Sequence, residues 1–460
     1  MKIVYYSHAS FKVSSSDNIS VLTDPWIASP IYGNSICLFP QLEICKEDYI
    51  NQDYLYISHD HPDHLCITTL KLFKKSIKIL IRKYDDASVI KNKLIDLGFL
   101  NIIEMKDRET KKLSSNFEVT LYCDHTSTDS LMIFKDDNHC FVDQNDCLLD
   151  EETYKEIGNK FDIDLGAVFY SGGSMYPGCF DYSHEKKVEL TKKRIYDQFD
   201  YSISSMKYMK IKNIIPGAND MCLVRNADFD DYSSALPIEF KDYLAKKKVD
   251  IGVHLMSSGD IYDFGLTDFE YKRYFKSREE WKEKVEKYRN TSSIQDMNKK
   301  LDNWEKDNKF DEENFENLFN DFLTKTKVEK QESVKINNFN VYLEVKRRSS
   351  NSLKYKITLD DRTNSLEKID NLFNEKDYHM KIIIDDYLVE MCMNGRYQWE
   401  DLLNNRWRVI RKNNDFSEAE YYFWIYLTKF SDYLLASKKL QFIEERDSLK
   451  LKCWEISVTS

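Results

Sequence analysis

Three histidines and two aspartates are concentrated in six consecutive residues, the HDHPDH motif at positions 59–64. Imidazole nitrogens and carboxylate oxygens are the usual ligands of zinc, and of iron or manganese in sites that activate oxygen. In an extended segment alternate side chains point to the same side, so His59 and His61 can share one pocket. A turn at the proline can then bring Asp63 and His64 into that pocket. The alternative, a polar surface turn, is less favoured because clustered imidazoles repel one another when protonated. The motif therefore predicts the beginning of a site for two adjacent metal ions.

Two further clusters follow apolar runs that are typical of strands. His125 comes after the run at 119–122, and Asp146 comes after the run at 140–142. If these strand ends meet the motif at one sheet edge, their side chains complete the site, and a carboxylate can bridge two cations about 4 Å apart. The expected metal ligands are His59, His61 and His125 for one ion and Asp63 and His64 for the other, with Asp146 between them.

Other polar residues are weaker candidates for this site. His8 follows the first expected strand, where a histidine more often holds a metal ligand by a hydrogen bond than binds the metal itself. We expect the same supporting role for Asp24. A late ligand could come from Asn219 or Asp220, which follow another expected strand. His254 is a further candidate, although a packing or surface position is the better expectation for it.

The first part of the chain, to about residue 265, alternates short apolar runs with helical patterns. Expected strands include 54–57, 119–122 and 140–142, and expected helices include 87–97 and 185–200. An alternation of this kind is typical of an α/β domain in which helices cover sheets. We therefore predict a layered α/β domain over residues 1–265.

The remaining chain changes character twice. Residues 266–332 are strongly charged, with a helical pattern at 277–288 and 312–324, and predict a helical connector. Its expected buried side chains are Trp281, Trp304, Phe315 and Phe319.

Residues 333–460 predict a small α+β module. Runs at 339–345 and 354–358 alternate as paired strands do, and 380–384 with 387–391 suggests a hairpin. A helix at 417–436 and a strand near 449–456 complete the expected elements.

Composition excludes several classes of function. A net charge of −11 over 460 residues argues against a nucleic-acid surface, which needs a basic face. No uninterrupted apolar run approaches the roughly 20 residues of a membrane span. The N-terminus resembles a strand rather than a signal peptide, so we expect a cytoplasmic protein. The 10 cysteines form no Cys-x-x-Cys pair, which favours reduced thiols and argues against an iron–sulfur cluster.

The order of the candidate residues resembles that of the metallo-β-lactamase superfamily. The matching positions are His8-Ala9-Ser10, Asp24-Pro25-Trp26, the HDHPDH motif, His125 and Asp146. Within that superfamily the chain is most similar to the catalytic part of the CMP-N-acetylneuraminate hydroxylases. The segments that carry this similarity are 54–65, 145–147, 169–177, 214–218 and 258–263, together with His125 and Asp129.

The resemblance implies an αββα sandwich with a metal site at one edge of two facing sheets. It also implies iron-dependent hydroxylation, but those hydroxylases carry an N-terminal Rieske iron–sulfur domain, which we do not expect in this chain. A hydroxylase would then need an external electron-transfer protein. Hydrolytic members of the superfamily usually carry a late histidine, whereas the matching stretch of this chain, GAND at 217–220, has none. The hydroxylase-like group shares this lack of a late histidine, which favours its chemistry. In hydrolytic relatives an aspartate at the position of Asp60 moves protons, so Asp60 and Asp63 are the candidate catalytic carboxylates.

Substrate contacts are the weakest expectation. Gly172 and Gly173 could let the backbone approach a ligand closely, because glycine tolerates positive φ, but a plain tight turn explains them equally well. Tyr176 and Asn219 are further candidates.

Two function hypotheses remain open. One is an iron-dependent enzyme that hydroxylates an N-acyl group of a nucleotide sugar or another amino-sugar metabolite. The other is a zinc or manganese hydrolase of an ester, amide, lactone or phosphodiester. Both need two divalent metal ions and a small-molecule substrate. A third reading, a binding protein without activity, is disfavoured by the complete set of ligands.

Overall fold

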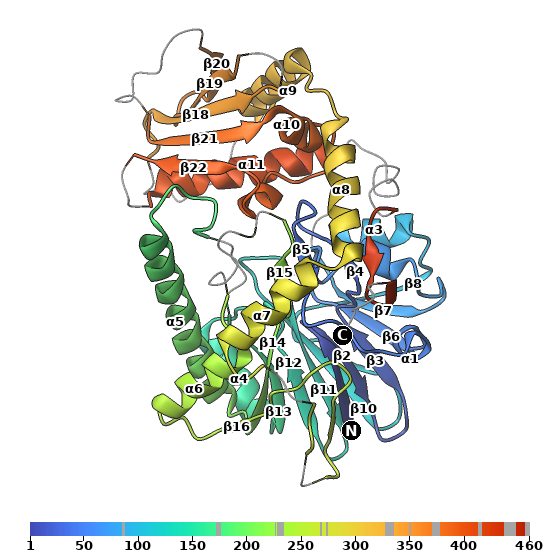
Figure 1. The fold of residues 1–460 in the computed structure, drawn as a ribbon. Coiled ribbons are helices and arrows are strands. Elements are labelled where there is room, and N and C mark those ends of the chain that lie inside the picture. Colours follow the sequence, from blue (N-terminus) through green and yellow to red (C-terminus); the bar gives the residue numbers. More distant parts are fainter. Residues whose placement is uncertain are drawn as a thin grey trace.

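The computed structural model describes residues 1–84, 88–171, 176–225, 227, 234–266, 269–272, 275–326, 335–348, 351–369, 378–412, 416–436 and 448–455. Two mixed sheets face each other in the N-terminal part (Figure 1). The first has the order β17 (Ile261–Asp263), β1 (Lys2–Ser7), β2 (Ser10–Ser14), β3 (Ser20–Thr23), β6 (Tyr54–Ile57), β7 (Lys78–Arg82) and β8 (Asn101–Met105). The second has the order β16 (Gly252–Val253), β14 (Asn213–Gly217), β13 (Leu165–Phe169), β12 (Cys140–Asp143), β11 (Ser130–Asp136), β10 (Phe117–Cys123) and β9 (Thr110–Lys112).

Strand β6 shows how the sequence pattern produces these layers. Its side chains alternate, so Tyr54 and Tyr56 face the core between the two sheets, whereas Leu55 and Ile57 pack under helices. Helices α1 (Lys46–Ile50), α2 (Ile67–Leu70) and α3 (Val89–Asp96) cover the first sheet, and α4 (Glu151–Lys160), α5 (His184–Met209) and α6 (Pro237–Lys246) cover the second. The predicted αββα sandwich is confirmed.

Two short ribbons lie beside the sandwich. Strand β5 (Ile36–Leu38) pairs with β15 (Met221–Leu223), and β4 (Ala28–Ser29) pairs with β23 (Leu451–Lys452). The second pair joins the far end of the chain to the N-terminal part. The expected strand near 449–456 is therefore real but short, and it is followed by the 3₁₀ turn η3 (Cys453–Glu455).

The helical connector consists of α7 (Arg278–Arg289), α8 (Ser292–Lys306) and α9 (Glu312–Lys325). The helices expected at 277–288 and 312–324 are confirmed, and α8 between them was not expected. Trp281, Phe315 and Phe319 are buried, and Trp304 is partly buried against the same cores.

The C-terminal part contains a five-stranded sheet with helices. Its order is β20 (Ser365–Lys368), β19 (Leu353–Leu359), β18 (Phe339–Lys346), β21 (Met380–Asp385) and β22 (Arg408–Arg411), with α10 (Asp386–Met393), η2 (Glu400–Leu403) and α11 (Glu418–Ala436) beside it.

One expected element of this sheet is wrong, because residues 387–391 form part of helix α10 rather than the second strand of a hairpin. Leu388, Val389, Met391 and Cys392 are all buried, which is the spacing of a helix face.

The domain boundaries at 265 and 332 stay predictions. No helix within the described residues is long and apolar enough to cross a membrane.

Candidate metal centre

The HDHPDH motif begins where β6 ends, at the seam of the two sheets. Ser130, the first residue of β11, donates a hydrogen bond from Oγ to the carbonyl of Ser58 (2.7 Å), and Tyr56 donates to the Ser130 carbonyl (2.8 Å). These bonds tie the first sheet to the second directly below the motif. His59 and His64 are buried, whereas His61 is exposed at the rim.

Two groups of side chains could each hold a metal ion. His8, Asp63 and His64 form one group, and His59, His61 and Asp146 form the other, with the ligand atoms of each group within 4.8 Å of one another. In the first group His8 Nε2 lies 3.0 Å from Asp63 Oδ2.

The two groups are neighbours. The rings of His59 and His64 are 4.0 Å apart between centroids, and His64 Nε2 lies 3.6 Å from Asp146 Oδ2. The same nitrogen lies 3.6 Å from Asp63 Oδ2. His64 and Asp146 therefore connect the groups, as adjacent ions in a dinuclear site require.

Some buried polar atoms of the candidate centre are suited to bind metal ions. Within the described residues, His64 Nε2 and Asp146 Oδ1 are buried and have no hydrogen-bond partner. Leaving such atoms without a partner costs free energy, so each needs an explanation. Bound cations would satisfy both atoms, because imidazole nitrogen and carboxylate oxygen are the donor types that divalent metals take.

Asp24 orients the buried ligand His64. Its Oδ2 lies 2.8 Å from His64 Nδ1, and its Oδ1 accepts a hydrogen bond from the backbone N–H of Ser58 (2.8 Å). A carboxylate on the far nitrogen of a metal-binding histidine fixes the tautomer and the ring orientation. The supporting role expected for Asp24 stays a prediction, for which this placement gives the geometry.

The charges of the buried groups depend on one another. Burial alone would lower the pKa of His64, but the carboxylates of Asp63, Asp146 and Asp24 raise it well above its usual value. Burial and the neighbouring His64 lower the pKa of His59. Burial would raise the pKa of Asp63, but His64 and His8 hold it well below its usual range. The centre thus keeps Asp63 ionised, the form that binds a cation.

Asp129 was not among the expected ligands, although it lies at the same centre. Its Oδ1 is 4.0 Å from His59 Nδ1. Burial and the carboxylate of Asp146 raise its pKa to about 6. The sequence signal for it was its place, with His125, among the residues that carry the resemblance to the hydroxylases.

His125 does not join either group. Its side chain is 69% exposed, and its Nε2 lies 3.3 Å from Asp107 Oδ2. The turn between β10 and β11 closes on itself, because Asp124 accepts hydrogen bonds from the backbone and hydroxyl of Thr126, which puts His125 at the tip. In the two groups the place expected for His125 is taken by Asp146, and His8 joins Asp63 and His64.

The candidate late ligands have other partners. Asp220 accepts hydrogen bonds from the Tyr5 hydroxyl and from the backbone N–H of His8 (3.2 Å), so it lies behind His8. His254 contacts the Tyr271 hydroxyl through Nδ1 (2.9 Å) and packs against Tyr262. Both residues bond to or pack against neighbouring side chains, and neither belongs to the two groups of candidate ligands.

The remaining candidates lie at several places. Asp60 is half-buried and accepts a hydrogen bond from Thr128 (3.2 Å). Asn219 donates to the Ala235 carbonyl, and its own Oδ1 is buried without a hydrogen bond in the described part of the chain. The Tyr176 hydroxyl accepts a hydrogen bond from Arg411 (3.1 Å). Gly172 and Gly173 lie outside the described residues.

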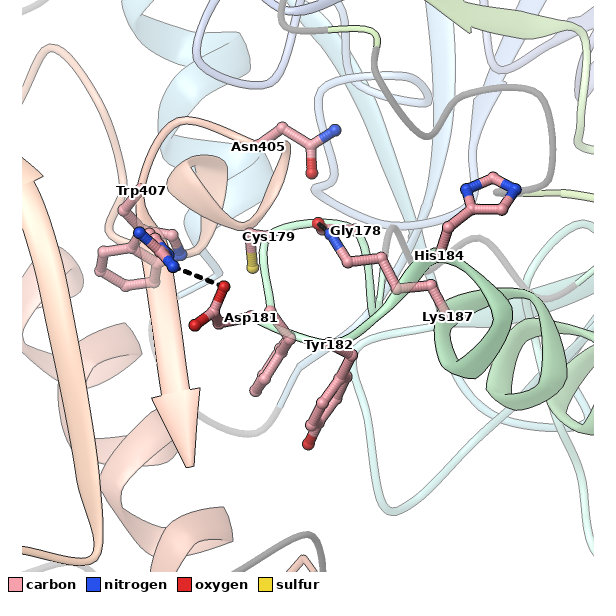
Figure 2. A pocket seen from close by; sticks show the side chains of 10 residues that line it. Gly178, Cys179, Asp181, Tyr182, His184, Lys187, Asn405 and Trp407 are labelled. Carbon is pink, nitrogen blue, oxygen red and sulfur yellow. Dashed lines mark hydrogen bonds and ion pairs between the residues drawn. The ribbon is translucent and has the colours of Figure 1, made fainter. Parts of the chain in front are cut away.

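A polar cavity of about 490 Å³ lies where the start of α5 meets the C-terminal sheet (Figure 2). Lys187 reaches across it and donates to the Gly178 carbonyl (2.6 Å), and Arg408 pairs with Asp181 (2.6 Å). The other polar side chains around it are His184, Asn405, Trp407 and Tyr182. Lys187 and Arg408 outnumber the single carboxylate of this lining, although the whole chain carries −11.

Parts of this chain match a known protein family and several known proteins. Residues 2–159 match the family model described as Beta-lactamase superfamily domain. A putative Rieske 2Fe-2S iron-sulfur protein of Mycobacterium tuberculosis is 24% identical over 293 residues, 60% of this chain and 56% of that protein. The cytidine monophosphate-N-acetylneuraminic acid hydroxylase of Asterias rubens is 28% identical over 204 residues, 42% of this chain and 30% of that protein.

Hydrolases also match. A metal-dependent hydrolase of Methanosphaera stadtmanae is 28% identical over 102 residues, 22% of this chain and 39% of that protein. Among solved structures, the metallo hydrolase Igni18 of Ignicoccus hospitalis has 18% identity and a TM-score of 0.39, covering 57% of this chain and 98% of that one. The chain spans about half the length of the mycobacterial relative. The expected resemblance of the N-terminal part to the metallo-β-lactamase superfamily is confirmed.

Proposed function

We propose that this chain, with its beta-lactamase superfamily domain at residues 2–159, is a dinuclear iron oxygenase that hydroxylates a small anionic metabolite. One observation carries the proposal: each of the two groups offers two imidazoles and one carboxylate. That donor set, with coordination positions left open, is the one that non-haem iron(II) oxygenases use. The stretch at which hydrolytic relatives carry a late histidine also supports an oxygenase. In this chain Asp220 lies there and accepts hydrogen bonds from Tyr5 and from the backbone of His8, so it adds no ligand to either group.

The residues present would hold the ions as two triads, His8, Asp63 and His64 for one and His59, His61 and Asp146 for the other. Bound iron would supply the redox chemistry that activates dioxygen. Asp24 would keep His64 in its binding orientation. Asp60, the second residue of the motif, is half-buried, where a carboxylate can pass a proton between the centre and solvent.

The reaction needs electrons. When one oxygen atom of O₂ becomes a hydroxyl in a C–H bond and the other becomes water, two electrons and two protons are consumed. We propose that an external electron-transfer protein delivers the two electrons and that the two protons come from solvent. The printed name of the Mycobacterium tuberculosis relative, a Rieske iron–sulfur protein, makes a Rieske-type cluster the donor class to try first.

The substrate we propose is an activated amino sugar that carries phosphate. The name of the Asterias rubens relative suggests this class. The polar cavity supports it, because its volume of about 490 Å³ lies in the range of small-ligand sites and Lys187 and Arg408 favour an anion. Contacts link the segment beside the cavity to the centre, since Arg406, which follows Asn405 in the chain, donates to the Gly33 carbonyl, and Tyr32, which precedes Gly33, donates to Asp63.

The direct test is oxygen incorporation. Protein loaded anaerobically with iron(II) is supplied with a chemical reductant, isotopically labelled dioxygen and a panel of N-acyl nucleotide sugars. Mass spectrometry should find a product that carries one labelled oxygen atom. A product labelled only from water, or full activity without oxygen, would refute the oxygenase.

The alternative is a zinc- or manganese-dependent hydrolase of an ester, amide, lactone or phosphodiester. It is favoured by the match to the Methanosphaera stadtmanae metal-dependent hydrolase and by the suitability of the same ligands for a metal-bound hydroxide. Turnover of such a substrate by the zinc-loaded protein without oxygen or reductant would establish it.

A further inference from the structure

The loop at residues 31–36 carries an unpredicted contact to the metal centre. The hydroxyl of Tyr32 donates a hydrogen bond to Asp63 Oδ1 (2.5 Å). Asp63 Oδ2, the other oxygen, lies beside His8 and His64. Tyr32 therefore fixes the rotation of a carboxylate whose second oxygen belongs to the first triad.

The backbone of this loop has an unfavourable conformation, which other parts of the structure must hold in place. Tyr32, Gly33 and Asn34 all have positive φ values, of 49°, 60° and 58°. Two of the three have side chains, which disfavour this region. Conformations of this kind persist only where the surrounding structure holds them in place.

The C-terminal part supplies that support. Arg406 donates from Nη1 to the Gly33 carbonyl (3.2 Å), and Asn34 donates to the Tyr397 hydroxyl. Gly33 is also in close contact, since a Cβ built there would lie 3.2 Å from the Cβ of Asp401. Only glycine permits this approach and a positive φ together.

The connector anchors these two supports. Glu305, near the end of α8, accepts hydrogen bonds from Arg406 Nη2 (2.6 Å) and from the Tyr397 hydroxyl. It also pairs with Arg225 (2.7 Å). The side chains of Glu305 and Arg406 are 1% and 3% exposed. A buried network of ion pairs and hydrogen bonds of this kind is rigid.

We infer that Tyr32 is a positioning residue for the metal centre, held on Asp63 by the connector and the C-terminal part through Glu305, Tyr397 and Arg406. The inference requires metal at His8, Asp63 and His64, but it does not depend on which reaction follows. Residues more than 200 positions after the motif thereby set the geometry of one of its ligands.

The test uses cobalt(II), whose visible absorption reports coordination, titrated into the full-length metal-free protein. Tyr32→Phe removes only the hydroxyl. It should lower the affinity for one of the two cobalt ions about 10–100-fold and change the absorption band of that ion. Tyr397→Phe should lower the affinity for the same ion by a smaller factor than Tyr32→Phe does. The double variant should be no weaker than Tyr32→Phe alone, because Tyr397 acts through Tyr32.

A matched control is Tyr426→Phe, since that hydroxyl accepts a hydrogen bond from Asn364 within the C-terminal part, away from the loop. It should leave both ions unchanged. Wild-type affinity and spectrum in Tyr32→Phe, or losses that multiply in the double variant, would overturn the inference. A wild-type protein that binds no cobalt would instead remove the metal centre, and with it the proposed function.

Discussion

His8 Nε2 lies 3.0 Å from Asp63 Oδ2, although 55 positions separate these residues along the chain. The backbone of His8 is fixed from two sides. Its N–H donates to Asp220 (3.2 Å), and its carbonyl accepts from Ala218 (2.8 Å). The end of β14 therefore aims the imidazole from β1 at the motif after β6, which makes His8 a ligand candidate rather than a remote support.

The first prediction compares His8 with His125. His8→Ala should lower the metal content from two ions per chain to about one, because it removes a donor of the first triad. His125→Ala is the matched control and should retain both ions, because that side chain is exposed at a hairpin tip. Elemental analysis of both variants after identical loading measures this. The reverse pattern would restore His125 as a ligand and reject His8.

A second prediction concerns Asp24. Asp24→Asn keeps the size of the side chain but removes the charge that orients His64. We expect the metal affinity at His64 to fall about 10–100-fold, with the fold retained. Competition with a coloured chelator measures the affinity, and circular dichroism checks the fold. Unchanged affinity would mean that Asp24 has no influence on the ligand.

The buried carboxylate of Glu305 predicts a dependence on pH. Burial would raise its pKa, but Arg406 and Arg225 lower it from 4.5 to about 2. Because the folded value lies below the unfolded one, ionised Glu305 stabilises the protein above pH 4.5, and this stability is lost as the pH falls toward 2. The loss should amount to roughly 3 kcal/mol.

Urea unfolding at several pH values measures this effect. Glu305→Gln should be less stable than wild type at neutral pH, by about 3–5 kcal/mol, because Arg406 and Arg225 lose their buried partner. Its free energy of unfolding should also fall less steeply below pH 4.5. Parallel curves for the two proteins would show that Glu305 does not titrate in this window.

The polar cavity yields a prediction about anion binding. Lys187→Met should weaken binding of cytidine monophosphate about tenfold, because one charged hydrogen bond is lost. Lys186→Met is the control, since Lys186 is paired with Glu189 outside the cavity lining. Calorimetry measures both. Equal affinities would show that the phosphate binds elsewhere.

Alternation along the strands made the sandwich predictable. In β6, Tyr54 and Tyr56 face one core and Leu55 and Ile57 the other, and the motif follows directly. Residues close in sequence, such as His59 and His61, were therefore grouped by local geometry alone.

Tertiary relationships were not predictable in the same way. His8 and His125 each follow a strand, and only the surrounding bonds direct one inward and leave the other at a hairpin tip. The contact of Tyr32 with Asp63 depends on Arg406 and Tyr397, which no local pattern connects to the motif. Residues 387–391 show a different limit, since a short apolar run suits a strand or a helix and packing decides between them.

The most direct test is a crystal structure of the iron-loaded protein with anomalous diffraction at the iron absorption edge. Two anomalous peaks should appear, one among His8, Asp63 and His64 and the other among His59, His61 and Asp146. An absence of peaks at these side chains, or a peak held by His125, would contradict the dinuclear centre.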